Sequence, residues 1–236
     1  MYKLLFFFFG MAITYGQKTT LYSVQLSKNE IDTIFSLEVK KKHNITFRVY
    51  RAYRYEDVNG QHLLLMTENA AKKENTAFIK ENKHVYNDSI KAYFFDLKDE
   101  QLELKRTLTE FIGTNEVSEE FSIAYWTKFF ALKDYDGNGT IDPILIYGSY
   151  GNNGTGDGRI KIMVFQGTRK SGIRHQNGTL DSERNTKVDA SFYELPMGIQ
   201  KQVMQQMQAI TANGSGIFPD GWQKDMKAKK LVMNEF

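Results

Sequence analysis

The chain has 236 residues, of which 41% are hydrophobic and 25% are charged, and its formal net charge is +3. This composition is that of a globular protein, not of a disordered chain, and the length suffices for one substantial core or two small ones. The absence of cysteine excludes disulfide bonds, a lipid-modified cysteine and thiolate sites for zinc or iron–sulfur clusters.

The first residues are typical of a secretory signal peptide. Lys3 precedes an apolar run from Leu4 to Ile13, and Gly16 ends the segment with a small residue. We therefore predict a signal peptide over residues 1–16 and an exported mature chain, periplasmic or at the cell surface, that begins at Gln17. The alternative, an uncleaved anchor, requires about 20 apolar residues, and this run is much shorter. No later segment predicts a transmembrane anchor.

The mature chain is close to electrically neutral. Cleavage would remove only one of the 31 basic residues, against 28 acidic residues. This balance predicts no nucleic-acid partner. The basic run from Lys40 to His43 is interpreted as a solvated turn.

The first half of the mature chain is predicted to be an antiparallel β-meander with one packed face. Residues 44–56 alternate aromatic and β-branched side chains with polar ones, which is typical of a half-buried strand. Further strand candidates are residues 62–68, 89–98, 102–111 and 121–134. Turns are expected at Asn59-Gly60 and over the polar stretch from Asn69 to Asn87. A helix over residues 98–111 is the alternative for that segment.

The second half combines short strands with one helix. Residues 143–149 and 159–167 are apolar strand candidates around a glycine-rich loop, and a polar connector follows over residues 174–189. An amphipathic helix that caps the sheet is predicted where Pro196 and Asn213-Gly214 flank apolar residues at helical spacing. Those apolar residues are Leu195, Ile199, Val203, Met207 and Ile210.

The predicted fold class is therefore mainly β (α+β), an antiparallel meander with a C-terminal helix. We expect a single mature domain over residues 17–236, with two subdomains, 17–115 and 116–236, as the alternative division.

Residues 134–143, with the sequence DYDGNGTIDP, predict a calcium site. Calcium takes six to eight oxygen ligands, which a short loop supplies by turning alternate side chains inward. Gly139 stands at the sixth place, where a calcium loop turns sharply. The expected ligands are the side chains of Asp134, Asp136 and Asn138, the backbone carbonyl of Thr140, and Asp142, directly or through water.

The loop departs from an EF-hand at its twelfth position. An EF-hand has a glutamate there, whereas this chain has Leu145 inside a predicted strand. The loop instead resembles the strand-to-strand calcium loops of FG-GAP-type extracellular repeats. The missing ligand is expected from water or from Asn152, Asn153 or Asp157 in the next loop.

Two alternatives remain for this loop. Magnesium is one, and the other is a turn without an ion, because Asp-Gly and Asn-Gly pairs favour tight turns by themselves.

The connector over residues 174–189 contains residue types that serve in acid–base catalysis or in the binding of an anionic sugar. Weak catalytic candidates are His175, Asp181, Glu183 and Arg184, beside Arg174 and Asp189. The alternation of opposite charges favours a self-neutralising hairpin instead, in which Arg184 pairs with Asp181 or Glu183.

Two other patterns predict no site. The histidines at positions 43, 62, 84 and 175 have no ligand spacing. Glycines at positions 154, 156 and 158 precede an expected strand, whereas a phosphate cradle precedes a helix.

The C-terminal half resembles a group of exported proteins of Gram-negative bacteria that carry the label of surface polysaccharide biosynthesis. The matching segments are Ile141-Asp142-Pro143, Gly158 to Ile162, Ile173-Arg174, Leu180 to Arg184 and Leu195-Pro196. The resemblance implies a link to surface glycans and supplies no catalytic residues.

We therefore expect an exported, non-enzymatic, calcium-binding envelope or surface protein, linked to surface polysaccharide. The alternative function is a hydrolase or transferase acting on polysaccharide, with Asp181 and Glu183 as its carboxyl pair and His175 or Arg184 assisting.

Overall fold

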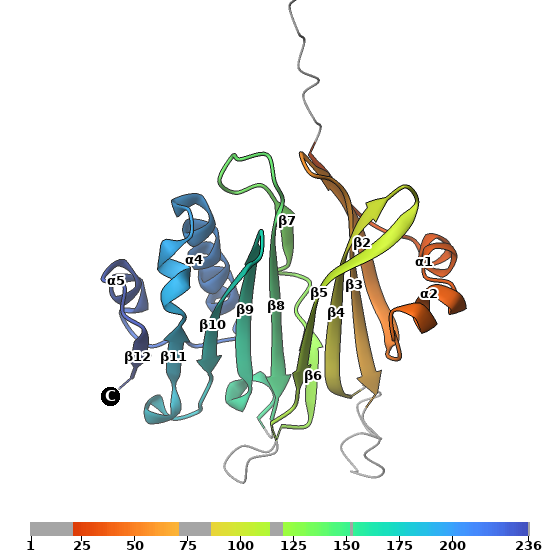
Figure 1. Ribbon diagram of the computed structural model, residues 1–236. Helices are drawn as coiled ribbons and strands as arrows, with labels where there is room; N and C mark the ends of the chain where they lie inside the picture. Colours follow the sequence, from red (N-terminus) through yellow and green to blue (C-terminus); the bar gives the residue numbers. More distant parts are fainter. Residues whose placement is uncertain (1–20, 71–85, 114–119, 152, 236) are drawn as a thin grey trace, which may run out of the picture.

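A computed structural model describes residues 21–70, 86–113, 120–151 and 153–235, and its strands form two antiparallel sheets (Figure 1). The first sheet contains β1 (Tyr22–Gln25), β2 (Arg48–Asp57), β3 (Gly60–Ala70), β4 (Asn87–Lys98) and β5 (Gln101–Phe111), in this order. The second sheet runs in the order β12 (Val232–Asn234), β11 (Asn185–Val188), β10 (Arg169–Gln176), β9 (Arg159–Gln166), β8 (Asp142–Tyr150) and β6 (Ser122–Tyr125), and β7 (Ala131–Lys133) also pairs with β8. The mainly β class predicted from the sequence is confirmed.

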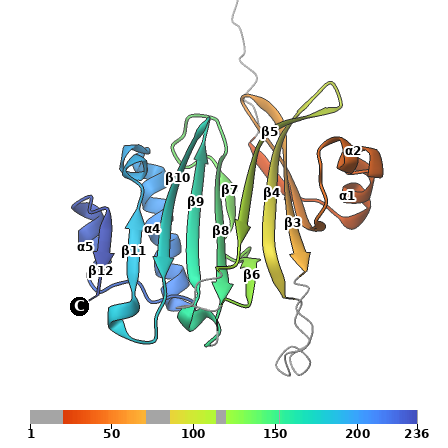
Figure 2. The same cartoon turned by 60° about the horizontal axis from the view of Figure 1, so that its bottom comes forward.

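Helices cover the outer faces of the two sheets. α1 (Lys28–Ile34) and α2 (Leu37–Lys42) lie beside the first sheet, and α4 (Met197–Ala212) and α5 (Trp222–Lys227) lie beside the second (Figures 1 and 2). The molecule therefore has the layer order helices, sheet, sheet, helices.

Each boundary between layers contains one hydrophobic cluster. Between the two sheets, Leu64 and Phe94 of the first meet Leu145 and Phe165 of the second. Because both sheets contribute side chains to this cluster, neither sheet buries its inner apolar face without the other. The outer clusters contain Phe35, Leu63, Tyr93 and Phe95 under α1 and α2, and Ile162, Val203, Met207 and Trp222 under α4 and α5.

The meander expected in the first half is present as the hairpins β2–β3, β3–β4 and β4–β5. The helical alternative for residues 98–111 is wrong, because β5 occupies this segment and pairs with β4 along its length. The turn at Asn59-Gly60 joins β2 to β3, and Gly60 has a φ of 117°, which favours glycine. Most of the polar stretch from 69 to 87 lies outside the described residues.

Three short helices, α1, α2 and α5, were missed by the sequence analysis. α1 begins with a capping box, in which Ser27 and Glu30 each bond the other's backbone N–H, and Ser36 caps α2. Both signals are present in the sequence, but the helices have only seven and six residues, too few for a clear apolar period. The basic run from Lys40 to His43 forms the last turn of α2 and its C-cap, in place of the expected turn.

Three strand boundaries also differ from the prediction. β2 begins at Arg48 and not at residue 44, because α2 and the following turn take the preceding residues. Residues 121–134 form two strands, β6 and β7, separated by a turn after the buried Trp126. The ends of the polar connector belong to β10 and β11, which pair with each other from Ile173 to Gln176.

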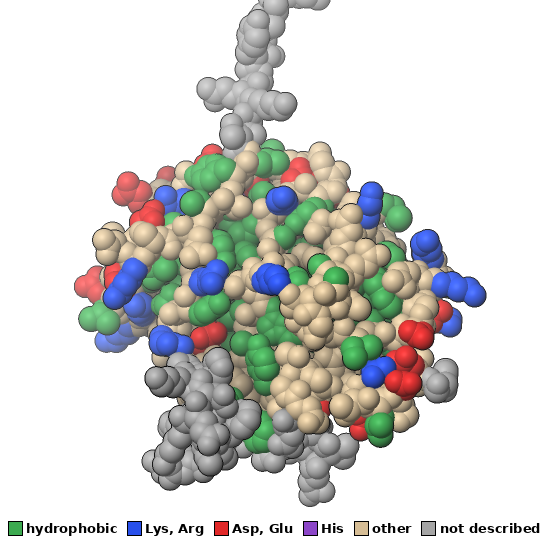
Figure 3. Space-filling model, turned by 180° about the vertical axis from the view of Figure 1, so that it is seen from behind, with side chains coloured by type: hydrophobic (Ala, Val, Ile, Leu, Met, Phe, Trp, Pro, Cys, Tyr) green, Lys and Arg blue, Asp and Glu red, His purple; other side chains and the backbone are tan. Residues whose placement is uncertain are grey.

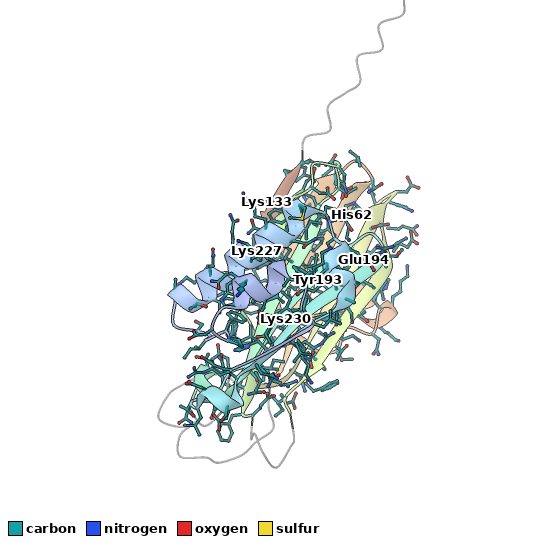
Figure 4. All side chains as sticks on the ribbon, turned by 90° about the vertical axis from the view of Figure 1, so that its left-hand side faces the viewer. His62, Lys133, Tyr193, Glu194, Lys227 and Lys230 are labelled. Atoms are coloured by element: carbon teal, nitrogen blue, oxygen red, sulfur yellow. The ribbon has the colours of Figure 1, made fainter. Side chains whose placement is uncertain are left out.

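The C-terminal amphipathic helix is confirmed as α4. Its predicted apolar residues Ile199, Val203, Met207 and Ile210 are fully buried in the cluster under the second sheet, and Leu195 is 4% exposed just before it. Pro196 is its N-cap residue and Asn213 its C-cap residue. In the side view of Figure 4, α4 and α5 lie on one side of the sheets, and Tyr193 and Lys230 lie together where the Tyr193 hydroxyl donates to the Lys230 carbonyl.

Candidate metal centre

The acidic loop joins β7 to β8 as a hairpin, since Lys133 pairs with Asp142. Gly137 and Gly139 have φ angles of 77° and 86°, in the left-handed region that favours glycine. A Cβ atom at Gly139 would lie 2.7 Å from the Val58 Cγ1 atom, so this position is also too crowded for a side chain. The loop therefore connects two strands, as the sequence predicts, and cannot belong to a helix–loop–helix motif.

The alternate side chains of the loop turn inward, as a calcium loop requires. Asp134 accepts hydrogen bonds from the backbone N–H groups of Gly137 (2.7 Å) and Gly139 (2.9 Å), and Asp136 accepts from Asn138 N–H (3.0 Å). Asn138 in turn accepts from the backbone N–H of Thr140 at 2.7 Å. Burial acts to raise the pKa of Asp134, but the N–H donors of Gly139 and Gly137 outweigh it and hold that pKa below its ordinary value.

Asp142 is the exceptional member of the set, because it is a carboxylate with no solvent exposure (0%). Its Oδ2 atom accepts from Tyr135 N–H at 3.2 Å, whereas its Oδ1 atom has no hydrogen-bond partner among the described residues. Burial raises the pKa of Asp142 to about 7; the Tyr135 N–H group opposes this rise, and the charges of Asp136 and Asp134 add to it.

The three carboxylates converge on one point. Ligand atoms of Asp134, Asp136 and Asp142 all lie within 4.8 Å of one another, so one cation can contact all three. The predicted ligands at these positions are thus brought together, with Asn138 bonded to Asp136 through its side-chain amide (2.9 Å).

The β2–β3 hairpin holds the loop from outside. Buried Asp57 accepts from Ile141 N–H at 3.0 Å, and Val58 N–H donates to the Gly139 carbonyl at 3.0 Å. His62 bonds Asp57 through Nε2 (3.1 Å) and lies at the same end of the molecule as Lys133 (Figure 4). Sequence reasoning missed this support because Asp57 lies 84 residues before Ile141 and belongs to no local motif.

A third element, the β9–β10 hairpin, also reaches the loop. Gln166 donates from Nε2 to the Asp136 Oδ2 atom at 3.0 Å. The loop is therefore fixed on both sides before any ion binds.

The expected supplementary ligands are in the wrong place. Asn153 and Asp157 follow the far end of β8, whose nine residues separate them from the loop by about 26 Å. Asp157 instead accepts from Asn153 N–H at 2.9 Å and closes its own turn. Asn152 lies outside the described residues. Among the described residues, the next loop therefore brings no further ligand to the acidic loop.

At the beginning of the connector, the polar side chains are paired with other residues of the same segment. Arg174 pairs with Asp189 at 2.5 Å. His175 is 2% exposed, and its ring nitrogens bond Thr186 and Asn177, each at 2.8 Å. Burial lowers the pKa of His175 to about 4, against the weaker effect of Asn177.

The remaining candidates of the connector surround Arg184. Its guanidinium contacts the carboxylates of Asp181 (2.7 Å) and Glu235 (3.1 Å), and it donates to the Gly178 carbonyl at 2.9 Å. Glu183 accepts from Leu180 N–H at 3.1 Å. The pairing of Arg184 with Asp181 predicted from charge alternation is confirmed.

Neither His43 nor His62 belongs to the group of possible metal ligands found among the described residues. His43 packs edge-on against Phe95, with ring centroids 5.1 Å apart. His62 bridges Asp57 and Asp96, and His84 lies outside the described residues.

Comparison of the chain with family models, with curated proteins and with solved structures finds no match. Among the described residues, none of the helices is long and apolar enough to cross a membrane.

Proposed function

We propose that the β7–β8 loop binds one calcium ion in an exported, non-enzymatic envelope or surface protein. The observation that carries this proposal is the Oδ1 atom of Asp142, a buried carboxylate oxygen without a partner among the described residues, beside two more carboxylates. An unpaired buried charge is costly, and a cation at this point removes the cost.

Calcium fits this set better than magnesium does. Magnesium requires near-ideal octahedral geometry at about 2.0–2.1 Å and keeps several waters, whereas calcium accepts irregular sets of carboxylate, amide and carbonyl oxygens at about 2.3–2.6 Å. The loop offers the carboxylates of Asp134, Asp136 and Asp142 beside its own backbone carbonyls. The Asn138 amide oxygen, which accepts from Thr140 N–H, would have to exchange that bond for the ion. A turn without an ion explains the bonds of Asp134 and Asp136 to the backbone, but it leaves the Oδ1 atom of Asp142 without a partner among the described residues.

The role of the ion would be structural. The loop is already bonded to the β2–β3 hairpin through Asp57 and to the β9–β10 hairpin through Gln166. A bound cation would stabilise the contacts of the loop with both hairpins, and so order the edge where the two sheets meet. Such local ordering by calcium is common in extracellular modules, which bind it with dissociation constants of about 0.1–1 mM.

The contacts of the connector support the non-enzymatic assignment. A general acid or base needs a titratable group in reach of a substrate. His175 is buried, and Arg184 is held by two carboxylates. Asp181 and Glu183 are exposed, but Asp181 already pairs with Arg184 and Glu183 accepts from Leu180 N–H. The link to surface glycans rests on the family resemblance of the C-terminal half, and we retain it as part of the proposal.

Calorimetric titration of the mature chain with calcium and with magnesium tests the assignment. We expect calcium binding with a dissociation constant of about 0.1–1 mM and at least tenfold weaker magnesium binding. Asp142→Asn, which keeps the size of the side chain, should weaken calcium binding at least tenfold. Asp220→Asn removes one exposed negative charge elsewhere and should leave binding unchanged.

The outcome that contradicts the proposal is equal binding by wild type and Asp142→Asn, or no binding up to several millimolar. Circular dichroism of each variant checks that the fold is intact, and Asp136→Ala provides a second, more exposed test of the same site.

Export is tested separately. Mass spectrometry of the protein from its native host should find Gln17 at the N-terminus, outside the cytoplasm. An intact Met1 in most molecules would disprove the signal peptide.

A further inference from the structure

A groove of about 570 Å³ lies between β1, the segment from Lys128 to Tyr135, and α4. Its size is within the range of about 300–1,000 Å³ found for ligand sites. The groove is on the side of the molecule where α4 lies; in the view from behind, hydrophobic side chains occupy the middle of this face with Lys and Arg side chains among them (Figure 3).

Aromatic side chains form much of the groove wall. Tyr53, Phe129, Phe130 and Tyr135 line it, and each of them is only partly buried. The rings of Tyr53 and Phe130 contact each other with centroids 4.7 Å apart, which joins the two sheets at this point. Partly exposed rings offer flat apolar surface while neighbouring polar groups remain in reach.

Amide side chains line the opposite wall. Gln202, Gln205 and Gln206 project from one face of α4, at the spacing that brings helical side chains together. Gln206 is 5% exposed; its Nε2 donates to the Phe129 carbonyl at 3.0 Å, and its Oε1 atom has no partner among the described residues. A buried acceptor of this kind calls for a hydrogen-bond donor from a ligand or a water.

The groove carries positive charge only. Lys128 and Lys133 line it, and no Asp or Glu is among the described residues that line it. Lys133 is exposed, and Lys128 bonds the Asn213 side chain at the end of α4.

We infer that this groove binds an acidic oligosaccharide. Sugar rings present C–H faces that pack on aromatic rings, hydroxyl groups that donate to and accept from amides, and, in uronic acids, carboxylates that attract lysines. A purely apolar ligand would leave the glutamines unpaired, and a neutral sugar would leave the lysines without a counter-charge.

The groove is connected to the proposed calcium loop through Tyr135. This residue belongs to the loop, its N–H bonds Asp142, and its side chain lines the groove. Its carbonyl lies so close to α4 that a Cβ atom at Gly198 would be 1.9 Å from it. Calcium binding would therefore fix one wall of the groove. This coupling rests on the proposed function, but the inference that the groove binds a saccharide does not.

Calorimetric titration with tetrasaccharides tests the inference. The probes are uronate-containing tetrasaccharides from hyaluronan, alginate and polygalacturonate, with cellotetraose as the neutral probe of equal length. We expect at least one uronate probe to bind at least tenfold more tightly than cellotetraose. Lys133→Ala and Gln205→Ala, both at exposed positions, should each weaken that binding at least threefold, whereas Lys201→Ala on the same helix should not.

The inference is overturned if no uronate probe binds up to 10 mM, if cellotetraose binds equally well, or if the two groove variants bind as wild type does. The calcium link is tested by comparing wild type and Asp136→Ala in one buffer with 1 mM free calcium, so that any calcium on the saccharide is the same. Weaker saccharide binding by Asp136→Ala is expected, and equal binding rejects the coupling. Calcium titration without saccharide reports the metal site alone, so the two failures are distinguishable.

Discussion

The β7–β8 loop and the connector over residues 174–189 are both polar and rich in charge, but they balance that charge differently. In the connector, Arg174 pairs with Asp189 and Arg184 with Asp181. In the loop, three carboxylates converge, and the basic group nearest in sequence, Lys133, is exposed and makes no ion pair in the described part of the chain.

The difference shows how a site is separated from a structural hairpin. Mixed charges close together neutralise one another and remain stable without a ligand, whereas like charges around a buried oxygen require something from outside. The stability of the connector should therefore not depend on calcium, whereas the stability of the loop should.

The largest effect is expected from Arg184→Ala in the connector. The Arg184 side chain is 11% exposed and that of Glu235 is 14% exposed, so the variant leaves a largely buried carboxylate without its cation. We expect a loss of about 2–4 kcal/mol in the free energy of unfolding, or roughly 4–15 °C in melting temperature, whether or not calcium is present.

Asp181→Ala is the matched control for Arg184→Ala. Its side chain is 67% exposed, so the loss should stay below about 1 kcal/mol. If Arg184→Ala left thermal stability unchanged but removed glycan binding or turnover, the connector would be a functional site and the contrast would fail.

A second connector prediction concerns pH. Burial lowers the pKa of His175 to about 4, below its ordinary value of 6.5, so the unfolded chain binds a proton more readily than the folded chain does. The stabilisation is complete above pH 6.5 and is lost as the pH falls toward 4. Between pH 7.5 and 5.0, protonation of this group should lower the free energy of unfolding by about 2 kcal/mol.

Urea unfolding of wild type and His175→Gln across this pH range measures the contribution. The variant should be less stable at pH 7.5. Between pH 7.5 and 5.0, its free energy of unfolding should fall by about 2 kcal/mol less than that of wild type. Parallel pH profiles would mean that His175 protonates freely in the folded state, and that the connector is open to solvent.

The smallest effect is expected from calcium itself. With a dissociation constant of about 0.1–1 mM, 1 mM free calcium adds about 0.4–1.4 kcal/mol, or roughly 1–6 °C in melting temperature. Magnesium should add less, and a chelator should remove the gain. Asp136→Ala should lose most of the calcium response. An identical melting temperature with calcium, magnesium and chelator would leave the loop as a turn only.

The same response should depend on pH. Because the pKa of Asp142 is raised to about 7, a proton competes with calcium for this carboxylate at lower pH. The calcium-induced rise in melting temperature should be present at pH 8 and absent at pH 5.5, where apparent affinity falls roughly tenfold per pH unit. A response that is unchanged at pH 5.5 would exclude Asp142 as a ligand.

The sequence predicts the elements whose signals are local and long. β2 shows the two-residue period, and α4 shows the helical period with a proline at its start. The helices α1 and α2 are too short to show a helical period of apolar residues, so their sequence signals are the N-cap residues Ser27 and Ser36.

The candidate site divides in the same way. The alternation of Asp134, Asp136 and Asn138 is local and is visible in the sequence. The burial of Asp142, the support from Asp57 and the position of Asp157 at the far end of β8 depend on sheet pairing between distant segments. The groove is likewise invisible to a local pattern, because its walls come from β1, β7 and α4.

A crystal structure of the mature chain grown with 5 mM calcium tests the central claim most directly. We predict one ion bound by oxygens of Asp134, Asp136 and Asp142 at about 2.3–2.6 Å, with Asp142 Oδ1 as a ligand and an anomalous signal at its position. A well-ordered loop in which these carboxylates bond only the backbone and water, with no ion among them, would contradict it.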